Sequence, residues 1–173
     1  GRAPARLDFK KLENTCGHHM AMADNAALLH ELRTYLVAAG RDPLTEAQET
    51  LMKQALSFLK SSAKTFPELL DKASFLIVSR PVAQDAKAID ALDTVSRGIL
   101  KSLTPQLQNA NWTKEALEPI LTEAATANGI GFGKLAAPLR AALAGRSVTP
   151  SVYDMMLVIG REETVARLQD ASH

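Results

Sequence analysis

Helix-start signals recur along this 173-residue chain, and no segment alternates apolar and polar residues for long enough to form a convincing strand. Thr45 and Gln48 have the spacing of a capping box, in which each side chain bonds the other residue's backbone N–H. Thr65 and Glu68 repeat that spacing. Residues 148–153 come nearest to a strand, but the segment is short and a proline interrupts it. Because apolar residues elsewhere recur at helical spacing, the sequence predicts an all-α fold.

Caps, glycines and prolines mark where the predicted helices begin and end. Alanine is abundant and aromatic residues make up only 5% of the chain, which also favours helices over sheets. Since a residue before proline avoids the helical region, Thr104–Pro105 is expected to end one helix, whereas Pro119 only kinks another. A short helix is expected to start at Asp8. The later helices are expected from Asp24 to Gly40, Thr45 through Leu59, Thr65 through Ile77, a segment through Ile89 and Ile99 to Thr104, Thr113 to Asn128, Thr149 through Ile159, and Arg161 through Leu168. Gly160 is expected to separate the last two.

Composition and charge restrict the class of protein. The chain has 46% apolar residues and a net charge of +1, which suits a globular protein without a polybasic arm. No apolar run approaches the roughly 20 residues that span a bilayer, so we expect no membrane partner. The single cysteine excludes an intrachain disulfide and predicts a reducing, cytoplasmic setting. Because the first residue is Gly1 rather than methionine, we expect a piece of a longer protein.

A basic stretch without acidic residues is the first candidate site. Residues 124–153 contain no aspartate or glutamate, whereas Lys134, Arg140 and Arg146 are all positive. Such a segment can attract an anion even when the whole chain is nearly neutral. Two interpretations remain open from the sequence: a site for an anion or nucleic acid, or two short helices and a loop that merely lack acidic residues.

Two predicted helix starts lie in this stretch. Gly129, Gly131 and Gly133 permit left-handed or closely approached backbone just before a helix. Thr149 is the expected N-cap of the next helix, with Pro150 at its first position. The free N–H groups of such a helix start could hold a phosphate or a base edge. Alternatively, Thr149 simply caps its own helix.

Aromatic residues offer a second type of contact. Trp112 has the spacing of a hydrophobic staple with Leu117, which we favour over a role as a base-stacking platform. Tyr153 follows the expected cap at once and could either stack on an unpaired base or face the core. The neighbouring Met155 and Met156 are expected to pack in the core.

No catalytic or metal site is predicted. Cys16, His18 and His19 are close in sequence, but a closed zinc site needs four ligands, and the other histidines show no paired spacing. The chain contains no phosphate-binding P-loop and no His-Glu-x-x-His motif. The glycines at 129–133 follow a predicted helix rather than a strand, unlike a dinucleotide-binding fingerprint. We therefore expect neither a catalytic residue nor a bound metal.

Several segments together resemble the C-terminal, anticodon-binding region of bacterial glutamyl-tRNA synthetases. The resemblance covers nearly all of the chain, and the run from Gly133 to Arg161 is its most specific part. The segments that carry it are Leu7-Asp8-Phe9, Lys64-Thr65-Phe66-Pro67-Glu68, Phe75-Leu76, Trp112-Thr113, residues 133–145, Thr149-Pro150-Ser151-Val152-Tyr153 and Ile159-Gly160-Arg161-Glu162.

That resemblance implies two consecutive helical subdomains, residues 1–82 and 83–173, which form a cage around the anticodon loop of glutamate tRNA. It implies a monomer joined to an N-terminal catalytic domain, which attaches glutamate to tRNA with ATP and magnesium. This piece alone would be inactive and hold no cofactor. The rival hypothesis is a synthetase-derived helical module that binds proteins without tRNA specificity, which the near-zero net charge would suit.

The resemblance also implies roles for individual residues. The positions that match Arg140, Thr149, Pro150 and Val152 contact anticodon bases in the family, and the one that matches Tyr153 lies beside them. Directed donors of this kind suit single-stranded loops, whose base edges are open. A further candidate contact in the same stretch is Lys134, and the additional ones are Arg146, Lys53, Gln54 and Lys60.

Two departures from the family pattern affect these expectations. Residues 15–20 stand where relatives usually have an asparagine and an aromatic residue. Many relatives also carry an arginine or glutamine before the Phe-Pro-Glu segment that reads the third anticodon base, but no arginine lies between Arg41 and Arg80. The sequence therefore leaves open whether glutamine tRNA is accepted beside glutamate tRNA.

Overall fold

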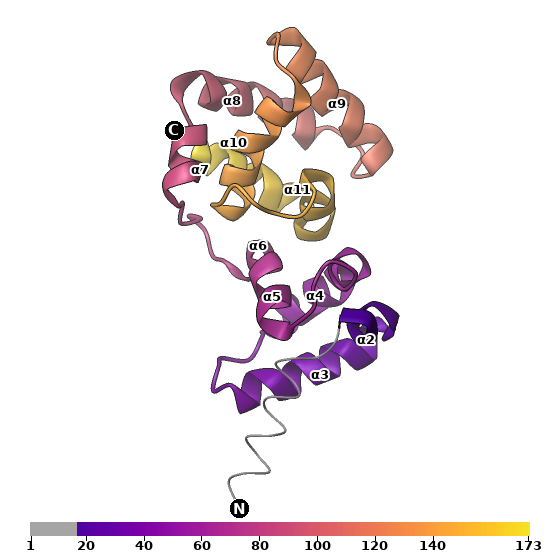
Figure 1. The fold of residues 1–173 in the computed structure, drawn as a ribbon. Helices are drawn as coiled ribbons and strands as arrows, with labels where there is room; N and C mark the ends of the chain where they lie inside the picture. The colour runs from indigo at the N-terminus through magenta and orange to yellow at the C-terminus, as the bar shows by residue number, and fades with distance from the viewer. Residues whose placement is uncertain (1–16) are drawn as a thin grey trace, which may run out of the picture. The chain divides into compact units, whose positions relative to one another are not determined.

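The computed structural model describes residues 17–173, which form ten helices and no strand (Figure 1). The all-α prediction is confirmed. The chain divides into two compact units, with the boundary between Ile77 and Val78. None of the described helices is both long enough and apolar enough to cross a membrane. The helix expected from Asp8 lies outside the described residues.

Caps define the helices of the first unit. Asp24 accepts hydrogen bonds from the N–H groups of Ala26 and Ala27, and Thr45 forms the expected capping box with Gln48. These caps satisfy N–H groups that a helix start leaves without partners. The helices of this unit are α2 (Gly17–Met22), α3 (Asn25–Ala38), α4 (Glu46–Leu59), α5 (Phe66–Lys72) and α6 (Ser74–Ile77).

The helix predicted from Thr65 through Ile77 is two helices, α5 and α6. Thr65 caps α5 by accepting from the Glu68 N–H, but the Glu68 carboxylate accepts from Lys64 instead of closing the box. The chain turns at Ala73, whose φ and ψ leave the helical region. After this turn the next two apolar side chains are buried in the unit's core, so tertiary packing overrides local propensity.

The second unit is built around α10, which contacts every other helix of the unit (Figure 1). Its residues 135–144 are mostly alanine and leucine, and eight residues of the helix are buried. Small side chains let neighbouring helices approach closely, which suits a central position. The helices are α7 (Ala86–Ala91), α8 (Thr94–Gln108), α9 (Lys114–Ala127), α10 (Phe132–Ala144) and α11 (Val152–Ala171).

The prediction of a single helix through Ile89 and Ile99 that ends at Thr104 was wrong in two respects. Asp93 accepts from the Ser96 N–H at 2.8 Å and starts α8 as a new helix after α7. Pro105 lies inside α8, which continues to Gln108. Because Lys101 and Pro105 are both exposed, water can reach the carbonyl that loses its N–H partner at the proline.

Two glycines end helices in the second unit in different ways. Gly145 is left-handed, with φ of 72°, and a Cβ placed there would lie 1.9 Å from the Ala83 carbonyl oxygen. Its own carbonyl accepts the Asp85 N–H at 2.9 Å, so the chain before α7 is held against the end of α10. At Gly160, φ of 86° and ψ of 171° break α11, which confirms the predicted separation.

Candidate nucleic-acid interface

Arg140 is the one charged residue in the buried part of α10, residues 135–144. Its side chain is half-buried. The Nε atom is buried and has no hydrogen-bond partner among the described residues. A buried donor without a partner costs stability. Because α10 packs against four other helices, the position of Arg140 is set by the core of the unit.

An aromatic pair joins the starts of α10 and α11. Phe132 and Tyr153 stack with ring centroids 5.7 Å apart and an interplanar angle of 5°. The Lys114 ammonium of α9 lies 5.9 Å from the centroid of the Tyr153 ring. Phe132 is 39% exposed and Tyr153 only 9%. Of the two roles left open for Tyr153, the structure therefore places its ring in the core, and Phe132, which the sequence analysis did not single out, lies outside it.

Burial and charge act together on the Tyr153 hydroxyl. Burial raises the pKa of Tyr153, and the Glu118 carboxylate raises it further, against a hydrogen bond with Thr122 that lowers it. Glu118 lies on α9, at a position before the acid-free stretch begins in sequence. The stretch is therefore not free of acidic neighbours in space.

The start of α11 differs from the prediction. Thr149 is not the N-cap, because its hydroxyl donates to the Pro150 carbonyl at 2.8 Å and the helix begins two residues later than expected. Ser151 occupies the cap position, but its side chain makes no capping hydrogen bond. The first N–H groups of α11 thus lack a side-chain acceptor from the cap residue. Val152 is only 2% exposed, which leaves its backbone rather than its side chain for contacts.

The basic residues of the stretch do not form one cluster along α10. Lys134 is exposed near the start of the helix. Six residues separate it from Arg140, which turns an ideal helix by about 240°, so the two side chains leave different faces. Arg146 is half-buried just after the end of α10. Of the three glycines, only Gly129 has positive φ, so the other two are not needed for left-handed backbone.

The additional candidates other than Arg146 lie on or just after α4 in the first unit. Lys53 and Gln54 are exposed. Lys60 is half-buried, and its ammonium donates to the Ala23 carbonyl at 2.9 Å. This bond holds the end of α4 against the segment before α3.

The aromatic and sulfur-containing side chains singled out beside these candidates are placed as follows. Trp112 is half-buried, donates its indole N–H to the Met156 carbonyl at 2.8 Å and lies 5.7 Å from the Arg161 guanidinium. This contact fixes the loop before α9 to α11. Met155 and Met156 are fully buried, as predicted.

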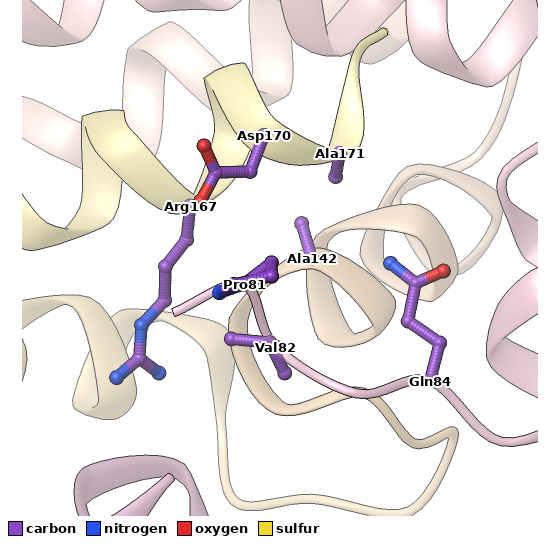
Figure 2. Close-up of a pocket in the computed structure, with 7 residues that line it drawn as sticks. All are labelled: Pro81, Val82, Gln84, Ala142, Arg167, Asp170 and Ala171. Atoms are coloured by element: carbon purple, nitrogen blue, oxygen red, sulfur yellow. The ribbon is translucent and has the colours of Figure 1, made fainter. Parts of the chain in front are cut away.

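A cavity of about 220 Å³ lies beside Arg167, a residue that the sequence did not identify. Figure 2 shows the Arg167 side chain extending from α11, with Pro81 and Val82 between it and Gln84. Arg167 is 3% exposed and donates to the Leu143 and Val78 carbonyls and to the Glu163 carboxylate. Because these groups occupy its donors, Arg167 joins α11 to α10 and to the start of the unit.

Cys16 and the His18 side chain lie outside the described part of the chain. His19 is exposed and lies 3.1 Å from the Glu31 carboxylate. Within the described residues no three His, Cys, Asp or Glu side chains gather as metal ligands would.

Comparison with known proteins relates this arrangement to one family. The family model described as an anticodon binding domain matches residues 26–172. Glutamate–tRNA ligase 2 of Cereibacter sphaeroides is 63% identical over 172 residues, which cover 99% of this chain and 36% of that protein. Glutamate–tRNA ligase 2 of Ruegeria pomeroyi is 60% identical over 173 residues, which cover all of this chain and 37% of that protein. The chain therefore spans little more than a third of the length of these relatives.

A solved structure shows the same fold. The glutamate tRNA ligase from Elizabethkingia meningosepticum superposes with a TM-score of 0.73, at 24% identity, over 90% of this chain and 30% of that one. At this identity the match supports the helical architecture alone. Since the family model spans most of both units, the chain belongs to the anticodon-binding-domain family.

Proposed function

We propose that this chain recognises the anticodon loop of glutamate tRNA as part of a longer, cytoplasmic glutamate–tRNA ligase. The observation that carries the proposal is the match to the anticodon binding domain over residues 26–172, joined with relatives named glutamate–tRNA ligase at 60% identity or more. In such an enzyme, ATP and magnesium would act in a catalytic domain outside this chain. The role of the chain is to bind and select the tRNA.

The second unit offers directed donors for unpaired bases. Arg140 combines a fixed position on α10 with a half-buried side chain. A guanidinium can donate two parallel hydrogen bonds to one base edge, which an ammonium cannot. The uncapped N–H groups at the start of α11 supply further donors beside Thr149 and Pro150. We propose that these groups together contact the anticodon.

The first unit offers candidate contacts of its own for the tRNA. Lys53 and Gln54 are exposed there and are the proposed contacts. Lys60 is a weaker candidate than its charge indicates, because its ammonium is already bonded to Ala23. The alternative of a protein-binding module without tRNA specificity has less support, since the relatives are named as ligases of glutamate and tRNA.

Titration of the full 173-residue chain with glutamate tRNA, at one fixed salt concentration, tests the proposal. Arg140→Ala should weaken binding by roughly 1–3 kcal/mol if the arginine makes a bidentate base contact. Arg140→Lys keeps the charge but removes the fork, so it should lose most of the same affinity. Lys87→Ala, which removes an exposed cation from α7, is the matched control and should bind like the original chain.

The same titration with a tRNA of different anticodon separates the two hypotheses. A base-reading chain prefers glutamate tRNA, and Arg140→Ala reduces that preference. Equal affinity for both tRNAs, unchanged by either Arg140 variant, would rule out anticodon recognition by this surface. Glutamine tRNA in the same series decides whether the chain accepts it as well.

A further inference from the structure

Phe132 is an exposed aromatic residue at the start of α10. It is 39% exposed, although the other phenylalanines in the described residues are half-buried or buried. Its neighbours Gly131 and Gly133 are both exposed, and a Cβ placed at either would meet no atom of the surrounding protein beyond the adjacent residues within 4 Å. No side chain on either adjacent residue can therefore cover the ring.

These two glycines are not explained by backbone geometry. Gly131 and Gly133 lack the positive φ that Gly129 has, so other residues could adopt the same backbone. What they do provide is the absence of a side chain on either residue next to Phe132. Backbone conformation therefore does not explain why both residues are glycine. Access of a planar group to the Phe132 ring would explain it.

The inner side of Phe132 is supported. Tyr153 stacks parallel to it at 5.7 Å, and among the described residues no other ring stacks on Phe132. Tyr153 is itself held by burial and by the Lys114 ammonium. Phe132 therefore has Tyr153 stacked against its ring, while 39% of its surface stays exposed.

The surroundings favour a nucleobase as the planar group. Phe132 lies within residues 124–153, which carry basic but no acidic side chains, and Lys134 is exposed two residues along, although the Glu118 carboxylate of α9 acts on the neighbouring Tyr153. Nucleobases stack on aromatic side chains, whereas their phosphates are attracted by basic ones. We propose that Phe132 is the platform on which an unpaired base of the anticodon loop stacks, with Tyr153 as a positioning residue behind it. The inference rests on the proposed function, which identifies glutamate tRNA as the ligand.

Four Phe132 variants separate stacking from apolar bulk. Phe132→Ala and Phe132→Leu remove the aromatic face, and both should raise the Kd for glutamate tRNA roughly 5- to 100-fold. Phe132→Tyr and Phe132→Trp keep a ring and should bind within about twofold of the original chain. Val95→Ala, at an apolar residue 72% exposed at the start of α8, is the control and should leave the Kd unchanged.

Salt dependence and abasic tRNAs give readouts that a structural role would not move. Phe132→Leu should lower affinity at every salt concentration without changing the slope of log K against log salt, because the ring neutralises no phosphate. Glutamate tRNAs that lack one anticodon-loop base at a time should lose affinity, and at one position Phe132→Leu should cause no further loss. The base missing from that tRNA is the one that stacks on Phe132.

The outcomes for the two proposals differ. If the original chain prefers glutamate tRNA but Phe132→Leu binds it equally well, or its loss adds to that of every abasic tRNA, stacking on Phe132 is refuted while anticodon recognition stands. If the original chain shows no preference among tRNAs, both fail. Thermal unfolding of each variant confirms that a weakened Kd does not reflect loss of the fold.

Discussion

Gly145→Ala tests how α10 is held in the second unit, and Gly129→Ala is its matched control. Both glycines are left-handed, with φ of 72° and 64°, so alanine costs about 1–2 kcal/mol of backbone strain at either position. Part of that cost is offset by about 0.4–1 kcal/mol, because alanine restricts the unfolded chain more than glycine does. The two variants should therefore share the same conformational penalty.

They differ in what the new methyl group meets. At Gly129 nothing lies within 4 Å, whereas at Gly145 the Cβ would be 1.9 Å from the Ala83 carbonyl oxygen. The atom in the way is backbone, so the segment before α7 must move by more than an ångström. Such overpacking costs typically about 1–3 kcal/mol. The shift also strains the hydrogen bond from Asp85 to the Gly145 carbonyl, worth about 0.5–1.5 kcal/mol.

The expected difference in unfolding free energy between Gly145→Ala and Gly129→Ala is thus roughly 2–4 kcal/mol. Urea unfolding followed by tryptophan fluorescence measures it, because Trp112 is the chain's single tryptophan and lies in the second unit. Equal unfolding free energies of the two variants, within about 0.5 kcal/mol, would show that the close approach of Ala83 to the end of α10 contributes nothing to the stability of the second unit.

Two further predictions concern the second unit. Gly160→Ala should lower its unfolding free energy by roughly 1–3 kcal/mol, since φ of 86° with ψ of 171° is nearly exclusive to glycine; an unchanged urea midpoint would contradict this. The Arg80 guanidinium lowers the pKa of Asp170, chiefly by hydrogen bonding. The resulting stability is present above the unfolded pKa of about 3.9 and lost as pH falls through the folded pKa, so Asp170→Asn should approach the original chain in stability at acid pH.

Cap chemistry made much of the first unit predictable. The Asp24 cap and the Thr45–Gln48 box were expected from residue type and spacing, and both form. Helix ends that depend on packing could not be obtained in this way. Ala73 gives no local signal for a turn, yet the chain turns there because the apolar residues that follow are buried in the same core.

The errors in the second unit have identifiable local causes. Asp93 has the spacing of an N-cap with Ser96, but it lies within a longer amphipathic pattern that conceals the break. Thr149 has an N-cap residue type, yet its hydroxyl bonds to the adjacent Pro150 carbonyl, so Ser151 takes the cap position. Side-chain identity alone does not decide between such competing hydrogen bonds.

The sequence indicated a location for the candidate site but not its geometry. The acid-free stretch indicated residues 124–153, which contain Arg140 and the start of α11. Whether Tyr153 or Phe132 faces outward depends on how α10 meets α11, which local spacing does not contain. Arg167 could not be found either, because a Glu163–Arg167 pair four residues apart resembles an ordinary solvated helix pair.

The low net charge is consistent with the proposed role because the site depends on a few groups held in fixed orientations rather than on the number of cations. Non-specific binding to nucleic acid scales with the phosphates that lysine and arginine neutralise, and a chain with net charge +1 has few cations to spare. Arg140 instead lies on a helix packed against four others, and Phe132 rests on Tyr153. Rigid placement reduces the conformational entropy lost when a base binds. A few fixed contacts can therefore select unpaired bases without a broad basic surface, while other cations of the unit, such as Arg167, serve the fold.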